Sequence, residues 1–282
     1  MEKIVKIYEN LKKCFKIDPI SNEITDLINN LVTESWEILK TFDKLELISK
    51  IQDKKYFAFI RNKKISRAVN IELFNEANYE SILPLSNDLF DKNSTEITKI
   101  VYSILMIFFC VIDIKKNGDQ KTPATFFEYL IGPLFAKRFK VNPRNQLEVL
   151  NLDMKAKLPT DYIFDLGDRK PKFHVPIKTS TRERVVQVWA HQKVLDGIYG
   201  MGRFLGILVC LAETKLDLKK QEVIEICLPD QWRIYQMFIA QLKRIYYLDV
   251  PKRYEELNLI FPKIPVKQFG DFFHEANTLM EI

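Results

Sequence analysis

The sequence has few of the residues that build zinc-bound or disulfide-linked folds. Its 282 residues contain four cysteines, which lie far apart and form neither a Cys-x-x-Cys pair nor a Cys/His spacing typical of a zinc site. It contains only three histidines, and none lies in a recognisable motif with a serine or cysteine nucleophile. We therefore expect free thiols in a reducing compartment, without structural zinc.

Long apolar runs are also missing. The most apolar run, residues 100–112, is shorter than the roughly 20 residues that a membrane-spanning helix needs, so it predicts a buried helix. The N-terminal residues have scattered charges and no continuous apolar core, which excludes a secretory signal of the usual kind. The glycines of residues 200–206 follow a helix, precede a strand and lack the lysine of a phosphate-binding loop. We expect a soluble cytoplasmic protein with no membrane contact and no nucleotide cofactor.

Positive charge is concentrated in one part of the chain. There are 43 Lys and Arg against 37 Asp and Glu, a formal net charge of +6. Residues 121–203 contain fifteen of these basic residues and eight of the acidic ones, so the rest of the chain is close to neutral. Such a local excess favours a polyanionic partner such as nucleic acid, and it is equally typical of a solvated lysine-rich face.

The order of apolar patterns predicts two regions. Residues 1–115 are mainly helical, with a short strand over 56–60, and a polar turn at Asn117-Gly118 separates them from residues 116–282. This order predicts an α/β (α+β) fold in which helices flank a central mixed β-sheet. The elements predicted in the second region are helices over 123–139, 181–199 and 230–247, and strands over 162–166, 173–178, 204–212 and 223–228.

The predicted hairpin contains the chemically informative residues. Asp161 precedes one strand and Lys178 ends the next, so a carboxylate and an ammonium can meet at one edge of the sheet. Phosphodiester hydrolysis uses this combination, because the carboxylate can hold a divalent cation and the lysine can neutralise charge that develops on the phosphate.

These residues also carry a resemblance to a known family. Leu158-Pro159-Thr160-Asp161, with Val175-Pro176-Ile177-Lys178 and the following TSTRERVVQVWAHQ, resembles the PD-(D/E)XK nuclease core, in particular that of type II restriction endonucleases. The resemblance covers about residues 122–247. It implies that Asp161 and the carbonyl of Ile177 bind Mg²⁺ and that Lys178 is catalytic. The sequence departs from the pattern at Pro176, where the family has its second acid.

Members of the superfamily without that acid supply a carboxylate or an amide from a neighbouring helix. Glu128 is a candidate because it is a charged residue in a very apolar helix, which favours a partnered or metal-linked role. Glu183 is another, although it also completes a capping box with Ser180, and both roles stay open. Asp165 could bind a metal or stabilise the turn that follows it, and both roles stay open. For Gln192 a structural role is favoured over a catalytic one.

Basic residues beside the hairpin are predicted to contact phosphates, which adds affinity without sequence information. They are Arg182, Arg184 and Lys193 on the following helix, and Arg169, Lys170 and Lys172 at the hairpin tip.

The resemblance implies an Mg²⁺-dependent restriction endonuclease that cuts both strands of duplex DNA at a short specific sequence. Cutting two antiparallel strands at a symmetric site requires two active sites related by a two-fold axis, so a homodimer is expected. Residues 1–115 are expected to contribute dimerisation, DNA contacts or both.

Two alternative functions stay open. One is a repair or recombination nuclease on the same core, although the helix after the lysine lacks the Gln-x-x-x-Tyr of that branch. The other is a DNA-binding protein with a degenerate core, suggested by Pro176.

Overall fold

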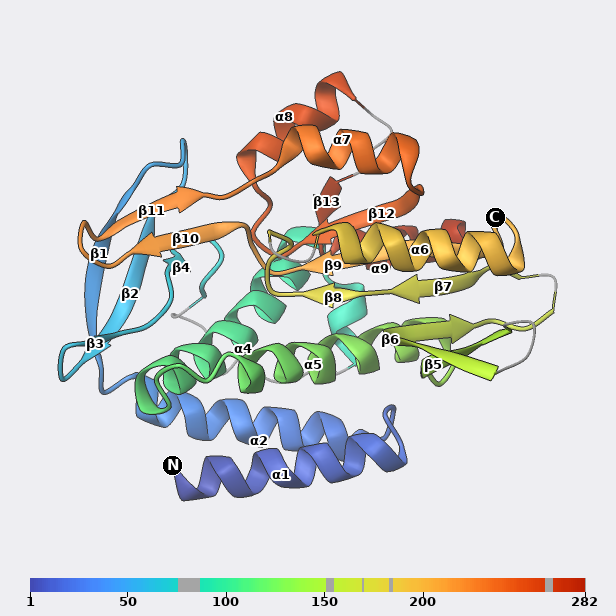
Figure 1. Ribbon diagram of the computed structural model, residues 1–282. Helices are drawn as coiled ribbons and strands as arrows, with labels where there is room; N and C mark the ends of the chain where they lie inside the picture. The colour runs from blue at the N-terminus through green and yellow to red at the C-terminus, as the bar shows by residue number, and fades with distance from the viewer. Residues whose placement is uncertain (76–86, 151–154, 169, 183–184, 262–265, 282) are drawn as a thin grey trace. The chain divides into compact units, whose positions relative to one another are not determined.

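Figure 1 shows the computed structural model, which describes residues 1–75, 87–150, 155–168, 170–182, 185–261 and 266–281. Contacts within the chain divide it into two compact units. The first consists of Met1–Leu130 and Thr214–Ile226, and the second of Ile131–Glu213 and Cys227–Ile282. The boundary predicted from the sequence lies at residue 115, whereas this division lies further along the chain, and residues 214–226 join the first unit. The role assigned to residues 1–115 stays a prediction.

The first unit opens with two amphipathic helices, α1 (Glu2–Ile17) and α2 (Asn22–Leu39). Each buries a stripe of apolar residues at three- and four-residue spacing, as the sequence periodicity predicts. These two helices pack against each other, and α2 packs against the apolar helix α4 (Ser94–Lys115). The remaining helical segments that begin in this unit are η1 (Asn87–Asp91) and α5 (Lys121–Phe139), which continues into the second unit.

Helix α4 contains the apolar run for which the sequence predicts a buried helix. It starts with a capping box, in which Asn93 and Glu96 each accept a hydrogen bond from the other's backbone amide. In the described part of the chain it is the one helix long and apolar enough to cross a membrane, and 89% of its apolar window is buried. This burial confirms that α4 is a core helix.

The first unit also contains a β-sheet, so its N-terminal region is not only helical. Strand β2 (Tyr56–Arg61) confirms the strand predicted over 56–60, and it pairs antiparallel with β1 (Asp43–Ser49). Strand β11 (Glu222–Glu225) pairs parallel with β1, far from it in sequence. The strand predicted over 223–228 therefore lies outside the central sheet. The other strands are β3 (Lys64–Ile65), β4 (Val69–Asn70) and β10 (Thr214–Asp217).

A mixed sheet of seven strands forms the second unit (Figure 1). Its main path runs in the order β13-β12-β9-β7-β6-β5, and β8 continues β7 along β9. Strands β5, β6 and β7 are antiparallel, whereas β7, β9, β12 and β13 are parallel. This sheet confirms the predicted mixed α/β architecture. The strands are β5 (Arg144–Leu150), β6 (Lys155–Asp165), β7 (Lys172–Val175), β8 (Ile177–Lys178), β9 (Phe204–Cys210), β12 (Leu242–Tyr247) and β13 (Val266–Gln268).

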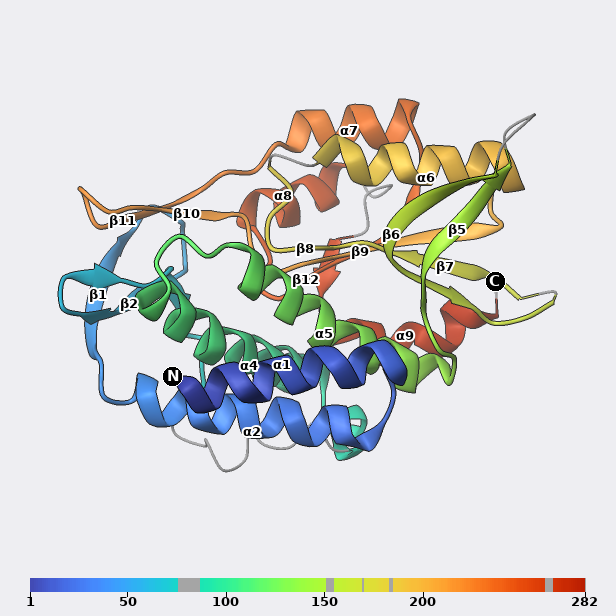
Figure 2. The same ribbon diagram turned by 60° about the horizontal axis from the view of Figure 1, so that its bottom comes forward.

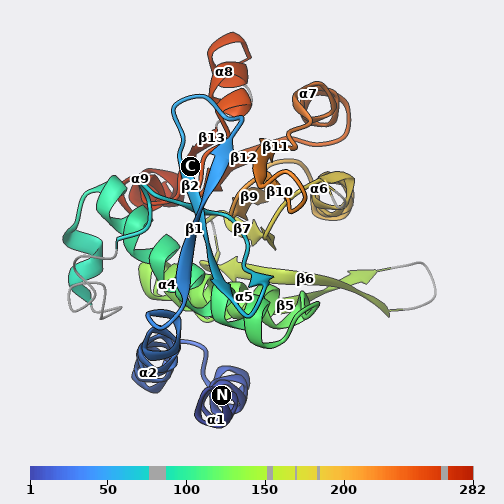
Figure 3. The same cartoon turned by 90° about the vertical axis from the view of Figure 1, so that its left-hand side faces the viewer.

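Helices cover both faces of this sheet, and the alternation of strand side chains explains how. On β12, Tyr247 packs in a cluster with Trp189 and Trp232, while its neighbour Tyr246 contacts Phe272 on the opposite face. Figures 2 and 3 show α6 and α7 together on one face, with α9 on the other. The helices of this unit are α6 (Val185–Tyr199), α7 (Pro229–Phe238), α8 (Lys252–Ile260) and α9 (Asp271–Met280).

The prediction of one helix over residues 230–247 is wrong, because this segment forms a helix followed by a strand. Helix α7 ends at Phe238, and β12 begins at Leu242. The side chain of Gln236 closes the break, since it accepts a hydrogen bond from the amide of Leu242 and donates one to its carbonyl. Such a side-chain bridge satisfies backbone groups that a continuous helix would pair, and the apolar pattern of the sequence does not reveal it.

Two glycines of the second unit provide a test of packing. A Cβ at Gly132 would lie 2.6 Å from the ring of Tyr162, whereas a Cβ at Gly197 would meet nothing within 4 Å. We expect Gly132→Ala to lower the free energy of unfolding by about 1–3 kcal/mol through overpacking. Gly197→Ala, inside α6, is expected to raise it by about 0.5–1 kcal/mol through helix propensity. Denaturant unfolding measures both, and equal effects of the two substitutions would contradict the packing described.

Candidate active site

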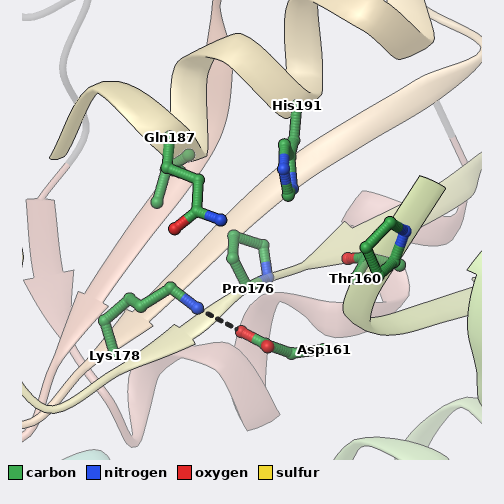
Figure 4. A pocket seen from close by; sticks show the side chains of 8 residues that line it. Thr160, Asp161, Pro176, Lys178, Gln187 and His191 are labelled. Carbon is green, nitrogen blue, oxygen red and sulfur yellow. Dashed lines mark hydrogen bonds and ion pairs between the residues drawn. The ribbon is translucent and has the colours of Figure 1, made fainter. Parts of the chain in front are cut away.

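The hairpin of β6 and β7 brings Asp161 and Lys178 together (Figure 4). In the antiparallel register Tyr162 is opposite Val175, so Asp161 faces the start of β8. Oδ2 of Asp161 lies 2.6 Å from Nζ of Lys178 and accepts a 2.7 Å hydrogen bond from the amide of Ile177. The predicted meeting of carboxylate and ammonium is therefore present in the structure.

This ion pair is largely removed from solvent. The side chains of Lys178 and Asp161 are 16% and 20% exposed, so their attraction is screened less than that of a surface pair. Within the residues that the structure describes, Oδ1 of Asp161 accepts no hydrogen bond. One carboxylate oxygen is thus committed to the protein, and the other is available to a cation or to water.

Pro176 occupies the position of the missing second acid. It separates β7 from β8, and its carbonyl accepts a hydrogen bond from the amide of Val209, which keeps the chain against β9. Its ring lines the pocket beside Asp161 and supplies no polar atom there. In the described part of the chain, no group of three or more His, Cys, Asp or Glu side chains is placed to hold a metal.

Helix α6 forms the remaining wall of the pocket, which has a volume of about 210 Å³. Figure 4 shows the side chains of Gln187 and His191 extending from α6 over the Asp161–Lys178 pair. Burial lowers the pKa of His191, and the charge of Lys178 lowers it further, while Asp161 opposes both effects. His191 is therefore held in its neutral form at neutral pH. No motif in the sequence marks His191, although its spacing of four residues from Gln187 is a usable signal.

Gln192 lies beside His191 in sequence and is directed elsewhere. It is buried, its amide nitrogen donates to the carbonyl of Phe204 and to Asp196, and its amide oxygen lies 3.2 Å from Nδ1 of His174. The structural role favoured for Gln192 agrees with this network. Burial lowers the pKa of His174 to about 4, although the hydrogen bond with Gln192 opposes the shift.

Asp165 is placed in the turn of the hairpin and not in the pocket. It accepts a hydrogen bond from the amide of Gly167 and pairs with Lys172 at 2.6 Å. Burial raises the pKa of Asp165, but the hydrogen bonds from Lys172 and Gly167 outweigh it, so the net shift is downward. Of the two roles left open for Asp165, the turn agrees with these contacts. They also engage Lys172 with a protein carboxylate.

A buried glutamate anchors the loop that follows Lys178. Glu213 accepts hydrogen bonds from the hydroxyl of Ser180, from the amide and hydroxyl of Thr181, and from the hydroxyl of Tyr247, all between 2.6 and 2.8 Å. Burial raises the pKa of Glu213, and these hydrogen bonds oppose the shift. No sequence pattern marks Glu213, because its partners come from distant segments of the chain.

The other predicted site residues fall into two groups. Glu128 belongs to the part of α5 in the first unit, and its catalytic role stays a prediction. Lys170, Arg182 and Lys193 are exposed on the second unit, as phosphate contacts must be. The remaining predicted residues, Glu183, Arg169 and Arg184, lie outside the described residues.

Comparisons with known proteins identify the fold. No protein-family model matches the sequence, and no curated protein matches it. Among solved structures, the chain is similar to the crystal structure of the type IIP restriction endonuclease Kpn2I, with a TM-score of 0.82 and 24% sequence identity over 100% of this chain and 98% of that chain. A second match is the complex of restriction endonuclease PspGI with substrate DNA, with a TM-score of 0.46 and 12% identity over 69% of this chain and 87% of that chain. The match to Kpn2I confirms that this chain has the fold of a restriction endonuclease.

The pKa of His174 predicts a dependence of stability on pH. Because the folded state keeps this histidine neutral down to about pH 4 and the unfolded chain protonates it near 6.5, the unfolded state binds more protons between these values. We expect the wild-type protein to lose roughly 3 kcal/mol of stability as the pH falls through this window. Denaturant unfolding between pH 7 and pH 4 should show a smaller loss for His174→Asn, and an unchanged loss for the exposed control His274→Ala.

Removal of the Glu213 carboxylate should destabilise the second unit. Glu213→Ala leaves the buried amide of Thr181 without its acceptor, and we expect a loss of about 2–3 kcal/mol in the free energy of unfolding. Glu213→Gln keeps one accepting oxygen and should lose less. The exposed control Glu256→Ala should change stability by less than about 0.5 kcal/mol. An equal effect of Glu213→Ala and Glu256→Ala would contradict an anchoring role.

Proposed function

We propose that this protein is a type II restriction endonuclease, which hydrolyses phosphodiester bonds of double-stranded DNA at a specific sequence with the help of Mg²⁺. The observation that carries the proposal is the Asp161–Lys178 pair, formed between β6 and β8 of a mixed sheet in a chain with a restriction-endonuclease fold. Kpn2I, to which the chain is similar, is by its name a type IIP restriction endonuclease.

The polar atoms around the pair suit a divalent cation. Oδ1 of Asp161 is uncommitted within the described residues, and a carboxylate oxygen is a ligand that Mg²⁺ prefers. The amide of Ile177 points toward Asp161, and in a strand the carbonyl of the same residue points to the same side. Asp161 and the carbonyl of Ile177 are therefore the groups that would hold the cation. When bound, a divalent cation supplies Lewis-acid polarisation of the phosphodiester and lowers the pKa of water.

Lys178 would act on the phosphate itself. Its ammonium is fixed by Asp161 and is partly shielded from solvent, so its charge acts in a medium that screens it less than water does. In this position it would neutralise negative charge that develops on the phosphate oxygens and orient the attacking water. Such a fixed charge lowers the barrier because it needs no reorganisation during the reaction.

The same proposal implies which residues contact DNA and how many copies of the chain assemble. Lys170, Arg182 and Lys193 would contact phosphates from the exposed surface of the second unit, which adds affinity without sequence information. Cleavage of both strands at a symmetric site requires two active sites, so we propose a homodimer that acts in the cytoplasm.

A second candidate is a DNA-binding protein with a degenerate core. It is favoured by Pro176, whose ring stands where a second acidic metal ligand would be expected. The presence of the uncommitted Asp161 oxygen and the paired Lys178 favours the nuclease over this alternative.

DNA cleavage tests the proposed function. Incubation of the purified protein with unmethylated phage DNA should give discrete fragments in Mg²⁺ and none in EDTA. We expect Lys178→Ala to lower the cleavage rate by at least about 10²-fold, because it removes a fixed charge at the reacting phosphate. Lys219→Ala, which changes an exposed turn lysine of the first unit, is the matched control and should cleave at the wild-type rate.

The products distinguish the alternatives. Progressive degradation from DNA ends would indicate a repair or recombination nuclease. Intact DNA under all conditions, together with tight DNA binding in a gel-shift assay, would identify a binding protein and refute the proposed activity.

A further inference from the structure

The strand that carries Asp161 continues into a two-stranded ribbon. Strand β6 pairs with β7 over residues 162–165, whereas its residues 155–159 pair with β5, the strand at one edge of the sheet. Figure 2 shows β5 and β6 side by side. The ribbon, residues 146–148 of β5 with residues 157–159 of β6, is therefore attached directly to the strand of the candidate active site.

The two faces of the ribbon differ in their side chains. Leu147 and Leu158 are directly opposite each other, and both pack against a small buried cluster formed by α6, β6 and β9. Because neighbouring side chains of a strand point to opposite faces, the residues on either side of this pair point away from the cluster. This second face, called the polar face here, consists of exposed residues: Gln146, Glu148, Lys157 and Pro159.

The polar face begins at the candidate active site. Pro159 lines the pocket beside Asp161, and Gln146 is its cross-strand partner. Lys157 follows on the same face of β6. At about 3.3 Å per residue, Pro159 and Lys157 lie roughly 7 Å and 13 Å from Asp161 along the strand. These spacings match the rise of about two to four base pairs, so DNA held at Asp161 would bring its next base pairs beside this face.

The ribbon is fixed to its surroundings. The hydroxyl of Tyr199, the last residue of α6, donates a hydrogen bond to the carbonyl of Glu148 on β5. The apolar contacts of Leu147 and Leu158 hold the same side of the ribbon. Side chains on such a supported strand keep a defined distance from Asp161, as groups that discriminate between ligands require.

The side chains of the polar face suit base edges better than phosphates. Phosphate binding favours an excess of cations, whereas Lys157 is directly opposite Glu148, so the two charges balance. Gln146 contributes an amide, which can donate and accept hydrogen bonds at the same time. The major groove of DNA admits a two-stranded β-ribbon, and in that groove glutamine pairs with adenine and lysine with guanine.

We propose that the polar face of the ribbon reads base pairs of DNA in the major groove, with Gln146 contacting an adenine and Lys157 a guanine. This inference rests on the proposed function for its partner, double-stranded DNA, and deepens it by assigning sequence readout to β5 and β6. The role differs from that of the phosphate contacts, which add affinity for every sequence alike.

Selection of DNA sites tests this assignment without cleavage. The full-length protein is mixed with DNA duplexes randomised over a central segment, in EDTA and in Ca²⁺, and the duplexes that it retains are sequenced. We expect Gln146→Ala to lower the preference for adenine at one position of each half-site about tenfold, while the other positions keep their preference. Lys157→Ala should have the same effect on a guanine at a different position.

Matched variants separate readout from a general loss of structure. Gln146→Arg should shift the preference at its position from adenine to guanine, because arginine pairs with guanine, and an unfolded variant cannot gain a new preference. Gln241→Ala and Lys219→Ala remove an exposed amide and an exposed ammonium outside the ribbon, and both should select the wild-type site. Circular dichroism confirms that each variant is folded before the selected sites are compared.

The outcomes distinguish this inference from the proposed function. An unchanged selected site in the folded Gln146→Ala and Lys157→Ala variants would overturn the readout role, and so would weaker binding by an equal factor for every sequence. Absence of any selected sequence with the wild-type protein would also overturn it, whether or not the protein cleaves DNA. A loss of preference confined to single positions would support it, even if the cleavage assay failed and the nuclease proposal had to be abandoned.

Discussion

The candidate site depends on the pairing of β6 with β7 and of β8 with β9. The antiparallel register of the first pair places Asp161 against the amide of Ile177, and the parallel pairing of the second holds the backbone of Lys178 against β9. Because both pairings use backbone hydrogen bonds, the positions of carboxylate and ammonium do not depend on flexible loops. Glu213 also fixes the loop that follows β8, because it accepts a hydrogen bond from the amide of Thr181.

Helix α6 is held over this hairpin by a buried polar network and not by apolar contacts alone. Gln192 joins the helix to the carbonyl of Phe204 and to His174 on the sheet below. The approach is close, since a Cβ at Gly206 would lie 2.7 Å from the amide oxygen of Gln192. A buried network of this kind restricts the rotation of a helix, because a different rotation would break its hydrogen bonds. This rotation turns Gln187 and His191 toward the pocket.

The charges and the neutral donors of the pocket thus come from different layers. The sheet supplies Asp161 and Lys178, which neutralise each other, and the helix supplies Gln187 and His191, which carry no charge at neutral pH. An added cation would therefore meet one available carboxylate oxygen, while the other oxygen of Asp161 holds the ammonium of Lys178. This balance follows from Pro176, which leaves the sheet with a single acid at this place.

The local elements of the chain were predictable where one segment contained the whole signal. The periodicity of α1 and α2, the apolar run of α4 and the hairpin that carries Asp161 and Lys178 were all visible in short windows. The break between α7 and β12 was not, because it depends on the side chain of Gln236 bridging to Leu242.

The sequence by itself determined the two charged residues of the site, since the hairpin places Asp161 beside the segment that leads to Lys178, and the pairing of β8 with β9 then holds Lys178 in place. Tertiary structure decided which helix residues join them. Gln192 and His191 are adjacent in sequence, yet packing against β9 buries the first and leaves the second in the pocket wall. The pairing of β11 with β1 was likewise decided by the fold, because backbone hydrogen bonds between distant strands leave no pattern in either segment alone.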